Sequence, residues 1–262
     1  MTNHLILKVS NVFVYVLVLF INYTGIVDPE NNRSHEDESN ETLLTPAVWT
    51  FKIWFLIYGL LGGFVIYQFF PPANSATVEG IKWFHVIASI LHLSFIVVWH
   101  QKVLEIVEIV LLLLLLIVLS KIYSNLGLYP SANIFDRLFI HYPFAIYTAW
   151  IGFATIVNFW LLIPALNQIL PSILAIVAIG AIGLHFIDYY HRNDWVFSGT
   201  LVWGLAGIAL NHEEVDEKPV MIAAAVAGGV IVGGILRFWI YQVVAWWRLR
   251  HGSLDESSPL LG

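Results

Sequence analysis

The chain contains no cysteine, and only 11% of its 262 residues are charged. Without thiols, disulfides, thiolate catalysis and cysteine-ligated iron–sulfur clusters are all excluded. The apolar share is 59% and the mean hydropathy is +0.78, more than a soluble domain of this length buries. The sequence has no stripe of basic residues, which is the feature that would indicate a nucleic-acid partner. The sequence also lacks a nucleophile–base pair, a phosphate loop and zinc-ligand spacing, so we expect neither an enzyme nor a metal site.

Eight apolar runs separate the polar segments, each near the length of a bilayer-spanning helix. They cover residues 5–21, 47–69, 81–99, 103–123, 141–163, 169–187, 195–210 and 220–247. They predict an all-α integral membrane protein with about eight transmembrane helices. The first run also fits the apolar region of a signal peptide, but no small-residue cleavage site follows it, which favours a retained helix.

Weak signals agree on an orientation. Three Asn-x-Ser/Thr glycosylation sequons, at Asn22, Asn32 and Asn40, lie in or beside the loop 22–46. In a eukaryotic host this clustering predicts a glycoprotein whose loop is lumenal or extracellular. The N-terminus and the tail 248–262 are then cytosolic, as are loops that carry basic residues, which agrees with the positive-inside bias.

The C-terminal tail contains a motif that predicts where in the cell the protein is sorted. Its "ESSPLL" stretch has the acidic-x-x-x-Leu-Leu form of an endosomal and lysosomal sorting signal, through Glu256, Leu260 and Leu261. A cytosolic tail would present this signal to an adaptor protein. We therefore expect a multi-pass protein of the lysosome, vacuole or endosome, or of the plasma membrane.

Two motifs carry a family resemblance. One is Phe-x-x-Trp-x-x-x-Tyr after a proline, here Phe51, Trp54 and Tyr58. The other is Trp-x-x-Phe-Ala-x-x-x-Asn, here Trp150, Phe153, Ala154 and Asn158. In this order they resemble the tryptophan-rich sensory protein family, also called the translocator protein or TspO/MBR family. The resemblance implies a five-helix core at 1–163, with three additional transmembrane helices at 164–247 as in a longer branch of the family.

The resemblance also implies a ligand, a porphyrin or a sterol, bound within the membrane. Where the family tends to place an asparagine in its third helix, this chain has His92, which joins the candidate ligand-binding residues. The residues of each motif share one helix face by their spacing, and an asparagine in an apolar span is costly unless it is hydrogen-bonded or faces a cavity. Two aromatic faces and one amide suit a flat apolar ligand. An interfacial aromatic belt with interhelical packing is the alternative.

Three other functions stay open. Glu105, Glu108 and Arg237 would suit a proton- or ion-coupled transporter, although carboxylates are also favoured at a helix N-terminus near the interface. His85 and His92 share a face and could hold haem, but polar packing explains them equally. An enzyme acting on a bound pigment or lipid ranks last.

Partners and packing follow from the same features. Besides the apolar ligand and the adaptor, we expect membrane lipids and a second copy of the chain as partners. The stretch "LHFIDYYHR" fits a loose sterol-contact pattern that an interfacial belt explains as well. Ala225, Gly229 and Gly233 recur every fourth residue, which permits close approach of another helix.

Overall fold

The structure is a computed structural model that describes residues 2–26, 41–101, 105–188, 194–211 and 214–251. Within these ranges the chain is helical and has no strand, which confirms the all-α prediction. The α-helices are α1 (Thr2–Ile26), α3 (Ile53–Tyr67), α4 (Phe84–Gln101), α5 (Glu105–Leu126), α6 (Ile134–Asp136), α7 (Tyr142–Leu162), α8 (Ile169–Asp188), α9 (Trp195–Ala209) and α10 (Lys218–His251). Short 3₁₀ and π segments connect them: η2 (Val48–Lys52), η3 (Pro71–Ala73), η4 (Ala76–Ile81), η5 (Arg137–His141) and η6 (Pro164–Leu166).

Length and composition make most of these helices membrane spans. Six described helical stretches are long and apolar enough to cross a bilayer: His4–Asn22, Val48–Tyr67, Glu105–Leu126, Ile134–Leu162, Ile169–Asp188 and Lys218–Arg250. Pro71–Ile81 and Phe84–Trp99 form a pair bent by 66°, which counts as a seventh candidate if the two helices are one broken span. The shorter apolar helix α9 brings the arrangement close to the eight spans that the sequence predicts.

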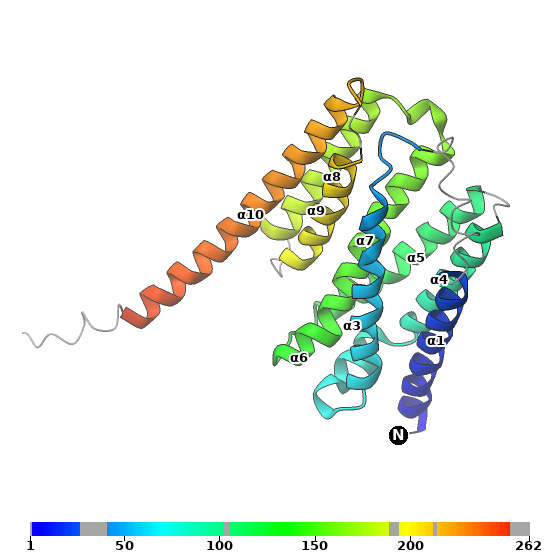
Figure 1. Cartoon of the computed structure of the whole chain (residues 1–262). Coiled ribbons are helices and arrows are strands. Elements are labelled where there is room, and N and C mark those ends of the chain that lie inside the picture. The colour runs from blue at the N-terminus through cyan, green and yellow to red at the C-terminus, as the bar shows by residue number, and fades with distance from the viewer. Residues whose placement is uncertain (1, 27–40, 102–104, 189–193, 212–213, 252–262) are drawn as a thin grey trace, which may run out of the picture.

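The helices form two neighbouring groups (Figure 1). In the first, α1 packs against α3 and α4, α4 against α5, and α5 and α3 against α7. In the second, α8, α9 and α10 pack against one another. The two groups meet where α9 lies along α7. The helices that follow residue 163 are therefore built onto the face of α7 that points away from α1.

Close approach between the groups depends on small residues of α9. A Cβ atom at Gly204 would lie 2.7 Å from the ring of Phe153 on α7, and one at Gly207 would lie 2.2 Å from the side chain of Thr50 in η2. The Gly207 carbonyl also accepts a hydrogen bond of 3.0 Å from the backbone N–H of Ala47. Glycine at these two positions lets η2 and α7 rest directly on the α9 backbone.

The longest helix, α10, leaves part of its surface open. Its 34 residues span about 51 Å, compared with about 30 Å for the hydrocarbon core of a bilayer. Its C-terminal part runs past the ends of α8 and α9 (Figure 1). The large apolar side chains of that part are exposed. Cβ atoms at Gly229 and Gly233 would meet nothing within 4 Å, so this small-residue face makes no contact inside the described chain.

Candidate functional site

Trp54 and Tyr58 of the first motif lie in a tight aromatic cluster between α3, α4 and α7. The Trp54 ring stacks on Tyr58 at 5.4 Å and meets the ring of His92 edge-on at 4.8 Å. The hydroxyl of Tyr58 lies 3.2 Å from His92 Nε2, and the hydroxyl of Tyr147 on α7 pairs with His92 Nδ1. Tyr58, His92 and Tyr147 are buried. Both ring nitrogens of His92 are therefore engaged by tyrosine hydroxyls.

The second motif lies in a separate contact group further along α7. Trp150 is only 2% exposed, stacks on Phe153 at 5.5 Å and meets Phe51 edge-on at 6.0 Å. The Asn158 side chain donates to the Ala154 carbonyl of its own helix at 2.8 Å, which satisfies one of its amide donors locally. Within the described chain no ring contact joins Trp54 to Trp150. The motif residues thus form two packed groups, and Phe51 of the first motif lies in the group of Trp150 and Phe153.

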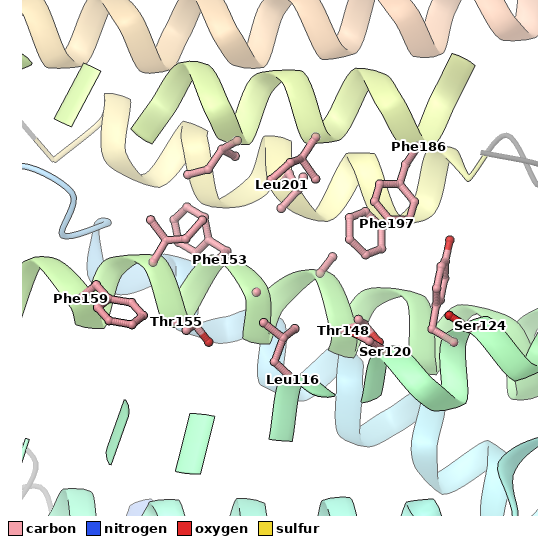
Figure 2. Close-up of a pocket in the computed structure, with 16 residues that line it drawn as sticks. Leu116, Ser120, Ser124, Thr148, Phe153, Thr155, Phe159, Phe186, Phe197 and Leu201 are labelled. Atoms are coloured by element: carbon pink, nitrogen blue, oxygen red, sulfur yellow. The ribbon is translucent and has the colours of Figure 1, made fainter. Parts of the chain in front are cut away.

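A cavity of about 380 Å³ opens on the α8–α9 side of α7 (Figure 2). Its size falls within the range of small-molecule sites. Four helices contribute to its walls, and most of the side chains are apolar. The lining residues are Leu116, Ser120, Tyr123, Ser124, Thr148, Ala149, Gly152, Phe153, Thr155, Ile156, Phe159, Ile179, Ile182, Phe186, Phe197 and Leu201. Of the seven candidate ligand-binding residues of the two motifs and His92, Phe153 alone is among them.

The two ends of the cavity differ in polarity. Figure 2 shows the hydroxyl groups of Ser120, Ser124 and Thr148 gathered at one end, beside Phe186 and Phe197. Phe159 lies at the opposite end, where Figure 2 also shows Thr155, whose hydroxyl donates to the Ile151 carbonyl at 2.7 Å. None of the lining residues is acidic, basic or a histidine. The cavity therefore presents an uncharged surface with most of its hydroxyl groups at one end.

An aromatic wall closes the polar end. The rings of Phe186 on α8 and Phe197 on α9 stack at 3.8 Å, and Tyr123 on α5 packs against both. Asp194 fixes this wall: its Oδ1 accepts from the backbone N–H groups of Val196 and Phe197, and its Oδ2 accepts from the Tyr123 hydroxyl at 2.7 Å. The Asp194 carboxylate is thus the N-cap of α9 and also ties that helix to α5.

Polar side chains tie α1 to its neighbours far from the cavity. The Asn11 amide donates to Gln68 Oε1 at 2.9 Å, and Asn11 Oδ1 lies 3.2 Å from His85 Nδ1. Gln68 in turn donates to the carbonyls of Lys8 and Val65, both at 3.0 Å. Asn11, Gln68 and His85 are all buried. Their partners account for His85 as polar packing, and no group of three or more potential metal ligands occurs among the described residues.

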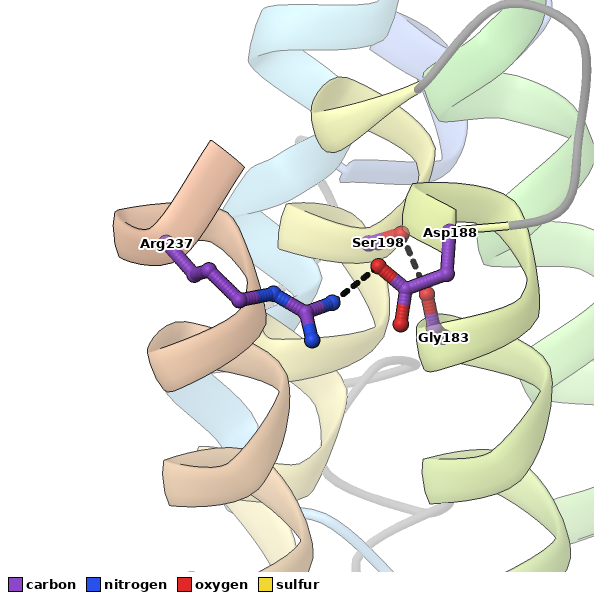
Figure 3. A network of polar contacts seen from close by, with 4 residues as sticks. All are labelled: Gly183, Asp188, Ser198 and Arg237. Atoms are coloured by element: carbon purple, nitrogen blue, oxygen red, sulfur yellow. Dashed lines mark hydrogen bonds and ion pairs between the residues drawn. The ribbon is translucent and has the colours of Figure 1, made fainter. Parts of the chain in front are cut away.

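The charged candidates for ion transport lie away from the cavity. Glu105 is exposed at the first residue of α5 and Glu108 is buried one turn later; neither lines the cavity. Arg237 on α10 pairs with Asp188 at the end of α8 (Figure 3). Nearby, the Ser198 hydroxyl donates to the Gly183 carbonyl at 2.8 Å and links α9 to α8. The first contact links α10 to α8, and the second links α9 to α8.

Several residues singled out from the sequence lie outside the described ranges. They are Asn32, Asn40, Glu256, Leu260 and Leu261, together with the end of the sterol-contact pattern beyond Asp188. The remaining sequon residue, Asn22, donates from its side chain to the Val18 carbonyl of α1 at 2.8 Å.

Sequence reasoning missed the residues that define the cavity. Ser120 and Ser124 are one helical turn apart in an otherwise apolar helix, a spacing that predicts a shared face. Thr148 and Thr155 are seven residues apart on α7, which is the corresponding signal there. The cavity-lining residues of α8 and α9 carry no comparable signal. Runs of Ile, Leu and Phe have the same sequence pattern whether they face lipid, another helix or a cavity.

The sequence model of a family described as TSPO-like protein matches residues 8–237. The match extends from α1 through α8 and α9 and into α10, so it includes all four helices that line the cavity. Neither the curated proteins nor the solved structures yield a significant match.

Proposed function

Because the chain belongs to the TSPO-like protein family, we propose that it binds a small apolar ligand within the membrane, in the cavity between α5, α7, α8 and α9. The observation that supports this most directly is the cavity itself, an uncharged space of about 380 Å³ within a multi-pass membrane protein. The resemblance to TspO proteins adds a ligand class, a porphyrin, a sterol or another lipid. The role is that of a receptor or carrier.

The aromatic residues of the motifs then take two roles. Phe153 contacts the ligand directly, because it lines the cavity. Trp150 supports it from behind, since the two rings are stacked. Trp54, Tyr58 and His92 fill the space between α3, α4 and α7 with one another, and we assign to them the task of holding that part of the bundle in place.

Thermal stabilisation by candidate ligands tests this proposal. A ligand present at about a hundred times its Kd stabilises the folded state by about 2.7 kcal/mol. Porphyrins, sterols and other lipids would be added one at a time to purified full-length protein, and the melting temperature measured. We expect at least one class to raise it.

A matched pair of glycine variants locates the binding. Gly152 lines the cavity from α7, and a Cβ there would meet Leu116 at 3.7 Å, an ordinary contact, so Gly152→Leu would occupy the cavity without a clash at the backbone. Gly59→Leu on α3 is the control, because a Cβ at that position meets nothing within 4 Å. Gly152→Leu should lose the ligand-induced shift and Gly59→Leu should keep it. Equal shifts in both variants would place the ligand elsewhere and refute the assignment.

A further inference from the structure

Two serine hydroxyls in the cavity differ from most of the other hydroxyls in the membrane-spanning helices. Ser89, Ser94, Thr148, Thr155, Ser198 and Thr200 each donate to the carbonyl four residues earlier in the same helix. This local bond is the usual way for a helix to satisfy a hydroxyl away from water. The side-chain hydroxyls of Ser120, which is half-buried, and of Ser124, which is exposed, make no hydrogen bond within the described part of the chain, although both residues line the cavity.

The other polar groups at that end are already engaged. The Thr148 hydroxyl is bonded to the Phe144 carbonyl at 2.6 Å, and the Tyr123 hydroxyl to Asp194 at 2.7 Å. What remains for a ligand is a pair of neutral hydroxyls one helical turn apart on α5. Each of them can both donate and accept. The rest of the wall is hydrocarbon apart from Thr155, whose hydroxyl is bonded to the Ile151 carbonyl at 2.7 Å.

From this arrangement we propose that the cavity selects an uncharged lipid alcohol, with its hydroxyl between Ser120 and Ser124 and its hydrocarbon body toward Phe159. The inference rests on the proposed function and narrows its ligand class. An anionic head such as a porphyrin carboxylate finds no cation in the lining, and burying a charge without a partner is costly. The same reasoning excludes an ammonium head, because the carboxylate behind the wall, Asp194, is occupied by three donors.

Photolabelling with a matched probe series tests the inference on the full-length protein in bilayers. The probes share one diazirine-bearing hexadecyl chain and differ at its end: hexadecane, hexadecanol, hexadecyl sulfonate and hexadecyl trimethylammonium. Peptides from α5, α7, α8 and α9 are recovered and the labelling of each is quantified. The double variant Ser120→Ala/Ser124→Ala removes both hydroxyls. Ser94→Ala on α4 is the control, because that serine lies outside the cavity lining.

We expect hexadecanol to label the cavity peptides at least about tenfold more strongly than either charged probe. The double variant should lose about tenfold of the hexadecanol labelling, the equivalent of one or two neutral hydrogen bonds. Hexadecane has no hydroxyl, so its labelling should be the same in the double variant as in the wild type, which shows that the cavity itself is intact. Each probe is compared between variant and wild type, so its partitioning into the bilayer cancels. Ser94→Ala should behave as the wild type.

Two results would overturn the inference and leave the proposed function intact. One is hexadecanol labelling of the cavity that the double variant does not reduce. The other is labelling by the sulfonate or the trimethylammonium probe as strong as that by hexadecanol. If none of the four probes labels the cavity peptides, the proposed function fails together with the inference.

Discussion

Replacing His92 by phenylalanine should lower the free energy of unfolding, and the loss can be worked out from the two hydrogen bonds that His92 makes. Phenylalanine keeps a ring against Trp54, which lies 4.8 Å from the His92 ring, but it removes both hydrogen bonds to the tyrosine hydroxyls. Tyr58 and Tyr147 are buried, so neither hydroxyl regains water. Interhelical hydrogen bonds in membrane proteins contribute about 0.6 kcal/mol on average and about 1.7 at most, so two of them predict a loss of about 1–3 kcal/mol.

The loss can be measured by equilibrium unfolding in mixed micelles titrated with sodium dodecyl sulfate. Tyr58→Phe and Tyr147→Phe should each account for about half of it, because each removes one of the two bonds. His4→Phe, at an exposed position near the start of α1, is the control for a histidine-to-phenylalanine change. A His92→Phe variant within about 0.5 kcal/mol of the wild type, the range of an ordinary surface substitution, would refute the reasoning.

The remaining predictions concern the wall of the cavity and the C-terminal helices. Asp194→Ala should cost about 1–3 kcal/mol in the same unfolding assay, because it removes the N-cap of α9 and a link to α5; Asp194→Asn should recover part of this. Trp150→Ala should weaken ligand binding by about 1–3 kcal/mol in titrations, because it removes the support of Phe153; unchanged affinity would contradict that role. Arg237→Gln should cost less than about 1 kcal/mol, because its side chain and that of Asp188 are 52% and 30% exposed; a larger loss would show that the pair is a main attachment of α10.

The spans could be predicted from the sequence because their physical cause is local. A run of about twenty apolar residues needs a helix to satisfy its backbone in lipid, whatever its neighbours are. The bend before α4 could not be predicted in this way. There the chain passes through the π-helix η4 and a non-glycine residue with positive φ, Lys82 at 55°, while Asn125 of α5 donates to the Gly80 carbonyl at 2.8 Å. This bend is accompanied by a contact from a helix that is distant in the sequence, and such a contact cannot be predicted from the local sequence pattern.

For the candidate site, too, the local features could be predicted from the sequence and the tertiary contacts could not. Periodicity identified which residues share a face, and the structure does bring Trp54, Tyr58 and His92 together. Periodicity could not identify which neighbouring helix each face contacts. Trp150 is on the face that packs against Phe51, and the cavity lies on the neighbouring face of α7, opposite helices whose sequence is uniformly apolar. Which of several equivalent apolar surfaces stays open depends on the packing of all four helices.

The central claim is that a ligand occupies the cavity between α5, α7, α8 and α9. The most direct measurement is an experimental structure of the full-length protein purified from membranes, determined for the wild type and for Gly152→Leu. The account predicts elongated non-protein density in the wild type, running from Ser120 and Ser124 past Phe153, and its loss in the variant. A wild-type cavity filled by side chains alone, or ligand density confined to the space around Trp54 and His92, would contradict it.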